Sequence, residues 1–95
     1  MHIISRKKLL LFSAIYADAE APLDTWYRAA KTAQWKNLTE LKRIFPSADL
    51  VGKYTVFNIK GNHYRLIAEI NYRGGTIFVR YILTHADYDK GNWKS

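Results

Sequence analysis

Two hydrophobic periods divide the chain of 95 residues. As far as residue 45, apolar side chains recur three and four positions apart, which is typical of amphipathic helices. From residue 54 onward they alternate with polar ones, which is typical of strands that bury one face. This order predicts an α+β fold in which N-terminal helices pack on one face of a small antiparallel sheet. No repeat, linker or low-complexity stretch interrupts it, so a single domain over residues 1–95 is expected.

The first apolar segment has two interpretations. Residues 2–4 are predicted to form a short strand, followed by a helix over about residues 6–16 that buries Leu10 and Ile15. The same helix has a basic start, and residues 17–19 match a small-x-small cleavage site, which together have the outline of a secretory signal peptide. The apolar run is short and contains a serine. We therefore expect a cytoplasmic protein in which this strand and helix belong to the core.

Two further helices are predicted before the strands begin. Pro22 suits the first position of a helix, and Asn37 followed three residues later by Glu40 predicts the capped start of another. That third helix should stop before Pro46, and residues 46–52 are expected to form a loop. The apolar stripe of the second helix comprises Leu23, Trp26, Tyr27 and Ala30.

The alternating part predicts three strands, over residues 54–59, 63–72 and 76–84. Gly61-Asn62 and Gly74-Gly75 fit two-residue hairpin turns between them. These turns predict a register. The first hairpin places Asn58 opposite Arg65. The second places Glu69 opposite Arg80, and Arg65 opposite Thr84.

The register predicts which side chains share a face of the sheet. One face is apolar and should receive the helices: Phe57, Ile59, Tyr64, Leu66, Ala68, Ile70, Ile77, Val79, Tyr81 and Leu83. The second face carries Tyr54, Asn58, Arg65, Glu69, Asn71, Arg80 and Thr84, with Ile67 and Ile82 between them. Antiparallel sheets commonly leave a polar face to solvent. Arginines on central strands are held in place, however, and their planar guanidinium suits phosphate, so this face is expected to be functional.

The net positive charge of the chain indicates which class of partner it binds. Fifteen Lys and Arg against eight Asp and Glu give a formal net charge of +7. Such an excess favours polyanions, whether RNA, DNA, the ribosome or an acidic protein. The charge is spread evenly along the chain, so an anion site must be assembled by the fold. The absence of cysteine excludes disulfides and thiolate chemistry.

The segment after the last strand places His85 and Tyr88 beside the strand end that carries Arg65. RNA cleavage by the ribose 2′-OH needs a proton acceptor, a proton donor for the leaving oxygen, and positive charge at the phosphate. His85 can be base or acid near neutral pH, Arg65 can hold phosphate, and Tyr88 can stack a base or transfer a proton. Each also has a structural interpretation: His85 as a surface or capping residue, and Tyr88 as a packing residue of the C-terminal segment. Asp87 and Asp89 make a weak ligand set, so neither a metal nor another cofactor is expected.

Two runs of sequence resemble the signature stretches of HigB-type toxins, a branch of the RelE-like mRNA interferases. Residues 56–67 contain Asn-x-x-Gly-Asn-x-x-Arg, and residues 81–90 contain Thr-His-x-x-Tyr-Asp. The resemblance covers essentially the whole chain. It implies a RelE-like fold and metal-independent, ribosome-dependent cleavage of mRNA. Arg65 matches the first motif, and His85 and Tyr88 match the second, as catalytic residues.

The same resemblance implies partners. A HigA-like antitoxin with a helix-turn-helix would neutralise the toxin, and operator DNA would be bound only through that antitoxin. The ribosome and mRNA would be the other partners, and no membrane partner is expected. The sheet and its turns supply further candidates for RNA binding, of which the first and last are placed by strand geometry alone: Lys53, Asn58, Lys60, Arg73 and Arg80.

Three other functions fit parts of the sequence. A non-catalytic RNA- or ribosome-binding module would use the same face and show the same salt dependence, but no cleavage would depend on His85 and Arg65. A transcriptional regulator would need a DNA-binding motif, and no convincing helix-turn-helix is present. A secreted protein is supported only by the pattern of residues 6–19.

Overall fold

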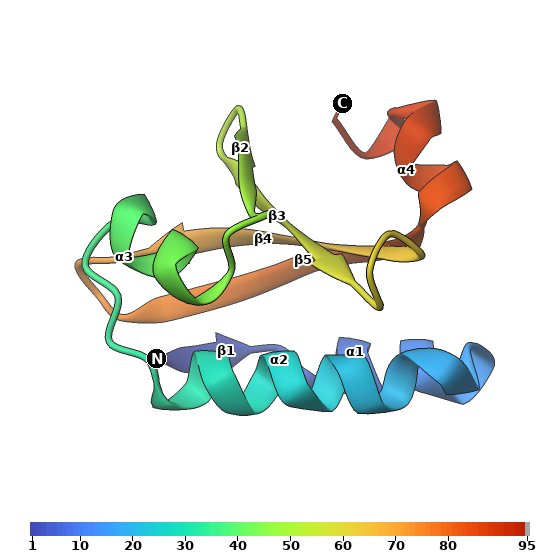
Figure 1. The fold of residues 1–95 in the computed structure, drawn as a ribbon, viewed down its shortest axis with the longest axis horizontal. Coiled ribbons are helices and arrows are strands. Elements are labelled where there is room, and N and C mark those ends of the chain that lie inside the picture. The colour runs from blue at the N-terminus through green and yellow to red at the C-terminus, as the bar shows by residue number, and fades with distance from the viewer. Residues whose placement is uncertain (95) are drawn as a thin grey trace.

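The computed structural model describes residues 1–94 and has an α+β fold around a five-stranded sheet of order β1-β5-β4-β3-β2 (Figure 1). The elements, in chain order, are β1 (His2–Ile4), α1 (Arg6–Ile15), the 3-10 helix η1 (Ala17–Ala19), α2 (Glu20–Thr32), α3 (Leu38–Ile44), β2 (Asp49–Val51), β3 (Tyr54–Ile59), β4 (Tyr64–Asn71), β5 (Thr76–Thr84), α4 (His85–Lys90) and the 3-10 helix η2 (Asn92–Lys94).

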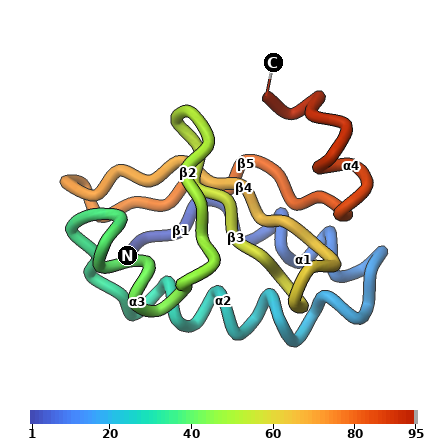
Figure 2. The backbone as a smooth tube through the Cα atoms, turned by 45° about the horizontal axis from the view of Figure 1, so that its top comes forward, coloured from blue at the N-terminus to red at the C-terminus, as the bar shows by residue number. Residues whose placement is uncertain are grey.

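The helices fall on both sides of the sheet. α1 and α2 cover one face, whereas α4 and the C-terminal segment lie beyond the other (Figures 1 and 2). The predicted RelE-like α+β arrangement is confirmed, with two additions at its edges. β1 pairs in parallel with the first part of β5. β2 pairs with β3 within the segment predicted to be a loop, because Gly52, with φ of 60°, allows a tight turn between them.

The main core lies between α2, α3 and the sheet. Leu23, Trp26 and Ala30 of α2 are buried, as predicted, although the helix begins at Glu20 rather than at Pro22. The ring of Trp26 meets Phe57 edge-on at 5.3 Å between centroids.

The cap of α3 is also confirmed. The Asn37 side chain accepts a hydrogen bond from the backbone N–H of Glu40 at 3.0 Å. The Glu40 carboxylate in turn accepts one from the backbone N–H of Lys36 at 3.0 Å. Two backbone donors at the start of the helix are thereby satisfied.

α1 buries a narrower stripe than predicted. Leu9 is buried, and Phe12 and Tyr16 pack partly against the core. Leu10 and Ile15 are 58% and 77% exposed, so the prediction that they are buried is wrong. The segment is apolar on most sides after its basic start, and its spacing therefore does not single out the side that meets the sheet.

The first hairpin has the predicted register, with Asn58 opposite Arg65. The second does not. Its turn is two residues longer, with Asn71 opposite Thr76, because the Asn71 side chain accepts a hydrogen bond from the backbone N–H of Gly74 at 2.9 Å and closes a wider turn.

A β-bulge then shifts the second hairpin once more. Val79 lies opposite Ala68 and Tyr81 opposite Ile67, which leaves Arg80 as the extra residue. Beyond the bulge Arg65 lies opposite Leu83, so the predicted pair with Thr84 is wrong. The bulge also reverses the alternation of the following residues. Tyr81 and Leu83 join the second face, Ile82 packs against the main core, and Thr84 lies opposite Tyr64.

Glu69 lies opposite Phe78 rather than Arg80, so the predicted cross-strand pair is wrong as a register. The predicted ion pair nevertheless forms diagonally, with Arg80 Nε 3.0 Å from Glu69 Oε1. Both side chains therefore share the second face, as expected.

The second face carries a small core of its own. Val56, Ile67 and Trp93 are buried there together, with Ile67 fully inaccessible. Val51, Tyr54, Leu83 and Tyr88 pack around them. The prediction of an open polar face is therefore corrected, because α4 and η2 cover part of it with aromatic side chains.

Asp18 of η1 ties the β3–β4 turn to the helical layer. Its carboxylate accepts a hydrogen bond from Tyr64 Oη at 2.5 Å and pairs with Lys60 Nζ at 2.7 Å. The bonds from Lys60 and Tyr64 lower the pKa of Asp18. The hydrogen bond to Asp18 raises the pKa of Tyr64 to about 12. The turn that precedes the candidate site is thus held by a charged group.

Acid should weaken the contacts of Asp18 with Lys60 and Tyr64. Because the pKa of Asp18 is lowered by folding, its contribution is present above the pKa of the unfolded chain and is lost as pH falls through the folded value. Urea unfolding measured from neutral pH down to about pH 2 should show a steeper loss of stability for wild type than for Asp18→Asn. Parallel curves for the two proteins would contradict this assignment.

Candidate active site

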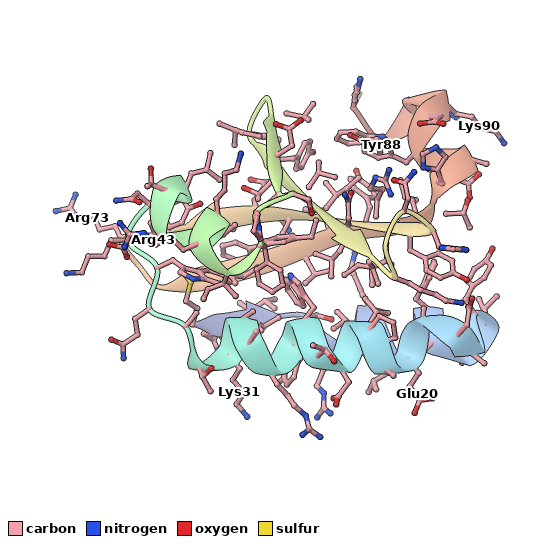
Figure 3. The ribbon with its side chains drawn as sticks, in the orientation of Figure 1. Glu20, Lys31, Arg43, Arg73, Tyr88 and Lys90 are labelled. Carbon is pink, nitrogen blue, oxygen red and sulfur yellow. The ribbon has the colours of Figure 1, made fainter. Side chains whose placement is uncertain are left out.

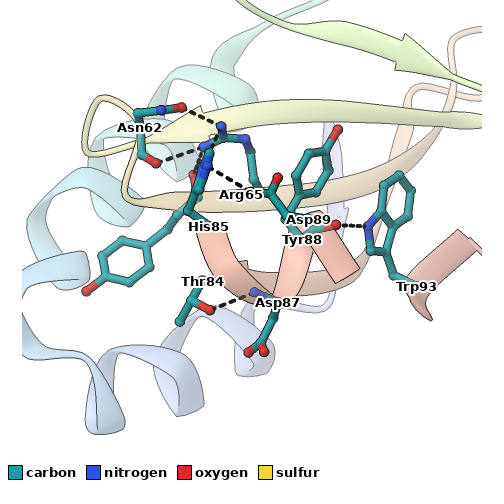
Figure 4. Close-up of polar contacts among 9 residues, drawn as sticks. Asn62, Arg65, Thr84, His85, Asp87, Tyr88, Asp89 and Trp93 are labelled. Atoms are coloured by element: carbon teal, nitrogen blue, oxygen red, sulfur yellow. Dashed lines mark hydrogen bonds and ion pairs between the residues drawn. The ribbon is translucent and has the colours of Figure 1, made fainter. Parts of the chain in front are cut away.

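Arg65, His85 and Tyr88 come together where β5 ends and α4 begins, on the second face of the sheet (Figure 4). Thr84 ends the strand and caps α4, since its hydroxyl oxygen accepts a hydrogen bond from the backbone N–H of Asp87 at 3.1 Å. The backbone N–H of His85 donates to the carbonyl of residue 63 at 3.0 Å. α4 is thereby fixed against the turn that precedes Arg65.

Arg65 is held inside the protein, with 7% of its surface exposed. One terminal nitrogen donates to the carbonyls of Asn62 and Tyr64, at 3.1 and 3.2 Å. The other donates to Asn62 Oδ1 and to His85 Nδ1, the latter at 3.1 Å. Both terminal nitrogens are therefore engaged, and a bidentate grip on phosphate through them would require breaking these bonds.

These contacts specify how His85 carries its proton. Nδ1 faces a guanidinium, which can only donate, so Nδ1 is the acceptor and the neutral ring holds its proton on Nε2. Nε2 lies 3.0 Å from Asp89 Oδ2, one helical turn further along α4. The side chains of His85 and Asp89 are 44% and 60% exposed. A hydrogen-bonded series, Asn62–Arg65–His85–Asp89, thus passes through the buried Arg65 and ends at the exposed Asp89.

Tyr88 closes the other side of Arg65. The guanidinium lies 5.2 Å from the centroid of the Tyr88 ring. The same ring stacks on the indole of Trp93, with 5.1 Å between the ring centroids and 16° between the planes. Trp93 Nε1 also donates to the Tyr88 carbonyl at 3.0 Å. Both contacts, with Arg65 and with Trp93, are made by the ring of Tyr88.

Three of the residues expected to bind RNA lie on the second face. Asn58 is exposed and opposite Arg65. Lys53 and Arg80 both approach Glu69, at 3.8 and 3.0 Å. These side chains extend the candidate site along the sheet.

The other two lie elsewhere. Lys60 is paired with Asp18 of the helical layer, as described above. Arg73 belongs to the β4–β5 turn, at the end of the molecule remote from Tyr88 and Lys90 (Figure 3).

Sequence reasoning missed three residues of this arrangement: Asn62, Asp89 and Trp93. Asn62 was assigned to a turn and Asp89 to a weak metal set, and although both belong to the two motifs, neither was given a role in the site. A signal for Asp89 was present, because Thr84 and Asp87 have the spacing of a helix cap and a helix places residue 89 one turn after His85.

Residues 1–94 contain no group of three His, Cys, Asp or Glu side chains arranged to hold a metal ion. Over the same range, no helix has the length and apolar character needed to cross a bilayer.

Known proteins and one family model match most of this chain. The family model for HigB toxins, described as the RelE-like toxic component of a toxin–antitoxin system, matches residues 19–91. The mRNA interferase HigB of Escherichia coli O6:H1 strain CFT073 is 33% identical over 93 residues, covering 95% of this chain and 90% of the relative. The mRNA interferase toxin HigB of E. coli K12 and the mRNA interferase HigB of Shigella flexneri are each 29% identical over 92 residues, covering 94% of this chain and 88% of the relative.

Proposed function

The chain belongs to the HigB family of RelE-like toxins of toxin–antitoxin systems, and from this premise we propose that it is an endoribonuclease that cleaves mRNA and so inhibits translation. The relatives that share most of its length are named mRNA interferases. The observation that carries the proposal is the series Asn62–Arg65–His85–Asp89, which presents proton-transfer groups to solvent beside a basic, aromatic surface.

The proposed reaction is attack of a ribose 2′-OH on the adjacent phosphate, with release of the 5′ oxygen. Proton transfer is assigned to the His85–Asp89 pair, because Nε2 offers a proton and the carboxylate offers an acceptor at the same exposed point. Arg65 supplies fixed positive charge and holds His85 in one tautomer. Tyr88 supports Arg65 through its ring, which in turn stacks on Trp93.

The finer features of this function come from the sequence resemblance and the charge. Cleavage would require the ribosome, and the toxin would act in the cytoplasm. A HigA-like helix-turn-helix antitoxin would neutralise the toxin, and operator DNA would be bound only through it. The net charge of +7 supports a polyanionic partner.

The test is expression in cells that lack an antitoxin. Growth arrest is expected, with new 5′ ends by primer extension in a translated message and none in a matched message without a start codon. Cuts in both messages would contradict ribosome dependence. Growth arrest without cuts would favour the non-catalytic RNA- or ribosome-binding module instead.

Tyr88 provides a separate test of how the site works. Tyr88→Phe should keep toxicity, because the ring contacts to Arg65 and Trp93 remain. Tyr88→Ala should lower the cleavage rate about 5- to 30-fold, because the Arg65 guanidinium loses a cation–π contact worth about 1–2 kcal/mol. Cleavage of a translated message at subsaturating enzyme gives the comparison. Loss of activity in Tyr88→Phe would show that the hydroxyl takes part in proton transfer.

A further inference from the structure

We propose that the hollow between β5 and α4 is a subsite for one base of single-stranded RNA, which stacks on Tyr81 and is selected for an exocyclic amino group by Asp87. This rests on the proposed function and extends it to a binding site next to the reacting groups. We call this feature the Tyr81 hollow.

The β-bulge is what makes the hollow possible. Without the extra residue Arg80, Tyr81 would point toward the helices, as its sequence position predicts. In the structure it lies opposite Ile67 on the second face and is 37% exposed. Its ring meets Tyr54 edge-on at 6.3 Å.

The hollow has the size and chemistry of a base site. Its volume is about 360 Å³, and its lining is Tyr81, Leu83, Asp87, Lys90, Asn92 and Trp93. An aromatic ring, a leucine and an indole form apolar walls, while a carboxylate and an ammonium stand at the rim. Every nucleobase has a π-face that can stack on such a ring, so stacking alone does not distinguish one base from another.

An unbroken row of rings joins the hollow to the candidate active site. Starting at Arg65, successive centres are separated by 5.2 Å to Tyr88, 5.1 Å to Trp93, 5.8 Å to Tyr54 and 6.3 Å to Tyr81. α4 contributes to both ends, since it carries His85 and Asp89 as well as Asp87 and Lys90. RNA held at His85 can therefore continue toward Tyr81 without leaving the same face.

Cations follow the row. Lys53 Nζ lies 5.3 Å from the centroid of Tyr54, and Lys94 Nζ lies 5.6 Å from that of Trp93. Lys90 is 67% exposed at the rim of the hollow. Rings interleaved with cations are the usual surface for single-stranded nucleic acid, because the cations follow the phosphates while the rings take the bases.

Asp87 gives the subsite its selectivity. Its carboxylate is 52% exposed and 3.6 Å from Lys90 Nζ, and an ionised carboxylate can only accept hydrogen bonds. Cytosine offers it an exocyclic amine, whereas uracil presents a carbonyl oxygen at the same position. The two pyrimidines have the same size, so they isolate this interaction.

The experiment measures binding of short, labelled 2′-O-methyl oligonucleotides of cytosine or uracil by fluorescence anisotropy at one fixed salt concentration. Without a 2′-OH the probes stay intact. Wild type should bind the cytosine probe more tightly than the uracil probe. Tyr81→Ala should raise both dissociation constants about 5- to 100-fold, and Tyr81→Phe should restore them. Asp87→Asn should narrow the difference between the probes, since an amide can also donate to uracil.

Tyr27→Ala, on α2 in the opposite layer, is the matched control and should bind as wild type does. The subsite is overturned if Tyr81→Ala binds like that control, if cytosine and uracil are bound equally by wild type, or if neither probe is bound. Thermal unfolding checks that Tyr81→Ala is folded. A toxin that cuts translated mRNA but binds independently of Tyr81 refutes the subsite alone. Binding through Tyr81 without any cleavage in cells refutes the proposed function alone.

Discussion

His85→Ala should lose its toxicity and keep its fold. The imidazole is the group best placed to exchange a proton with RNA, because Arg65 fixes its inner nitrogen and its outer nitrogen faces Asp89 and solvent. Removing one acid–base group typically lowers the rate by about 10²–10⁴-fold, enough to turn growth arrest into normal growth. The side chain is 44% exposed, but its removal leaves one N–H of the buried Arg65 guanidinium without an acceptor, so the unfolding free energy should fall by about 1–3 kcal/mol.

Growth of antitoxin-free cells, primer extension on a translated message and urea unfolding give the three readouts. His2→Ala, an exposed histidine of β1, is the matched control and should remain toxic. Asp89→Asn keeps an acceptor for His85 Nε2 but removes the charge. Its cleavage rate should therefore fall between those of wild type and His85→Ala, and the pH dependence of that rate should differ from wild type. If His85→Ala still cuts, proton transfer belongs to another group, such as Lys53 or Tyr88.

Arg65→Ala should lose both activity and stability. The sequence placed Arg65 on a polar face of the sheet, but the guanidinium is buried and makes four hydrogen bonds. Its loss leaves the carbonyls of Asn62 and Tyr64 without this donor, and a buried polar group without a partner costs about 1–3 kcal/mol. Activity should fall by about 10²–10³-fold, because a fixed charge and the position of His85 are lost together.

The same three measurements apply. Arg65→Lys should fail to restore activity, since a single ammonium cannot reproduce the planar set of donors. Arg28→Ala is the control: Arg28 is 79% exposed and pairs with Asp24 on the same helix, so neither activity nor stability should change. If Arg65→Ala still cuts the message, the candidate site on the second face is wrong; if it stays toxic without cutting, the non-catalytic binding module becomes the better interpretation.

The sequence was sufficient for the parts of the fold that short-range chemistry decides. The stripe of α2, the cap at Asn37 and the first hairpin all depend on residues close together in the chain. The second hairpin depends on a side chain, that of Asn71, replacing part of the backbone turn, and on one extra residue at Arg80. Neither changes the alternating pattern, so the pattern predicted Tyr81 on the wrong face.

The candidate site was predicted in its residue types and only partly in its arrangement. The motifs and the chemistry of RNA cleavage singled out Arg65, His85 and Tyr88, which the structure brings together. Burial of Arg65 could not be predicted, because it depends on α4, which docks on the sheet from a position 20 residues further along the chain. Asp89 could have been found, since treating Thr84 as a helix cap places it beside His85.

The small core around Ile67 has a consequence for biosynthesis. The groups that would act on RNA, His85 and Asp89, and the indole of Trp93 that covers Ile67 all belong to the segment that follows β5. A nascent chain that has emerged only as far as β5 holds the helical layer and the strands but no proton-transfer pair. It also leaves Ile67 without its cover. The proposed proton-transfer pair therefore takes its place beside Arg65 only when α4 docks on the sheet.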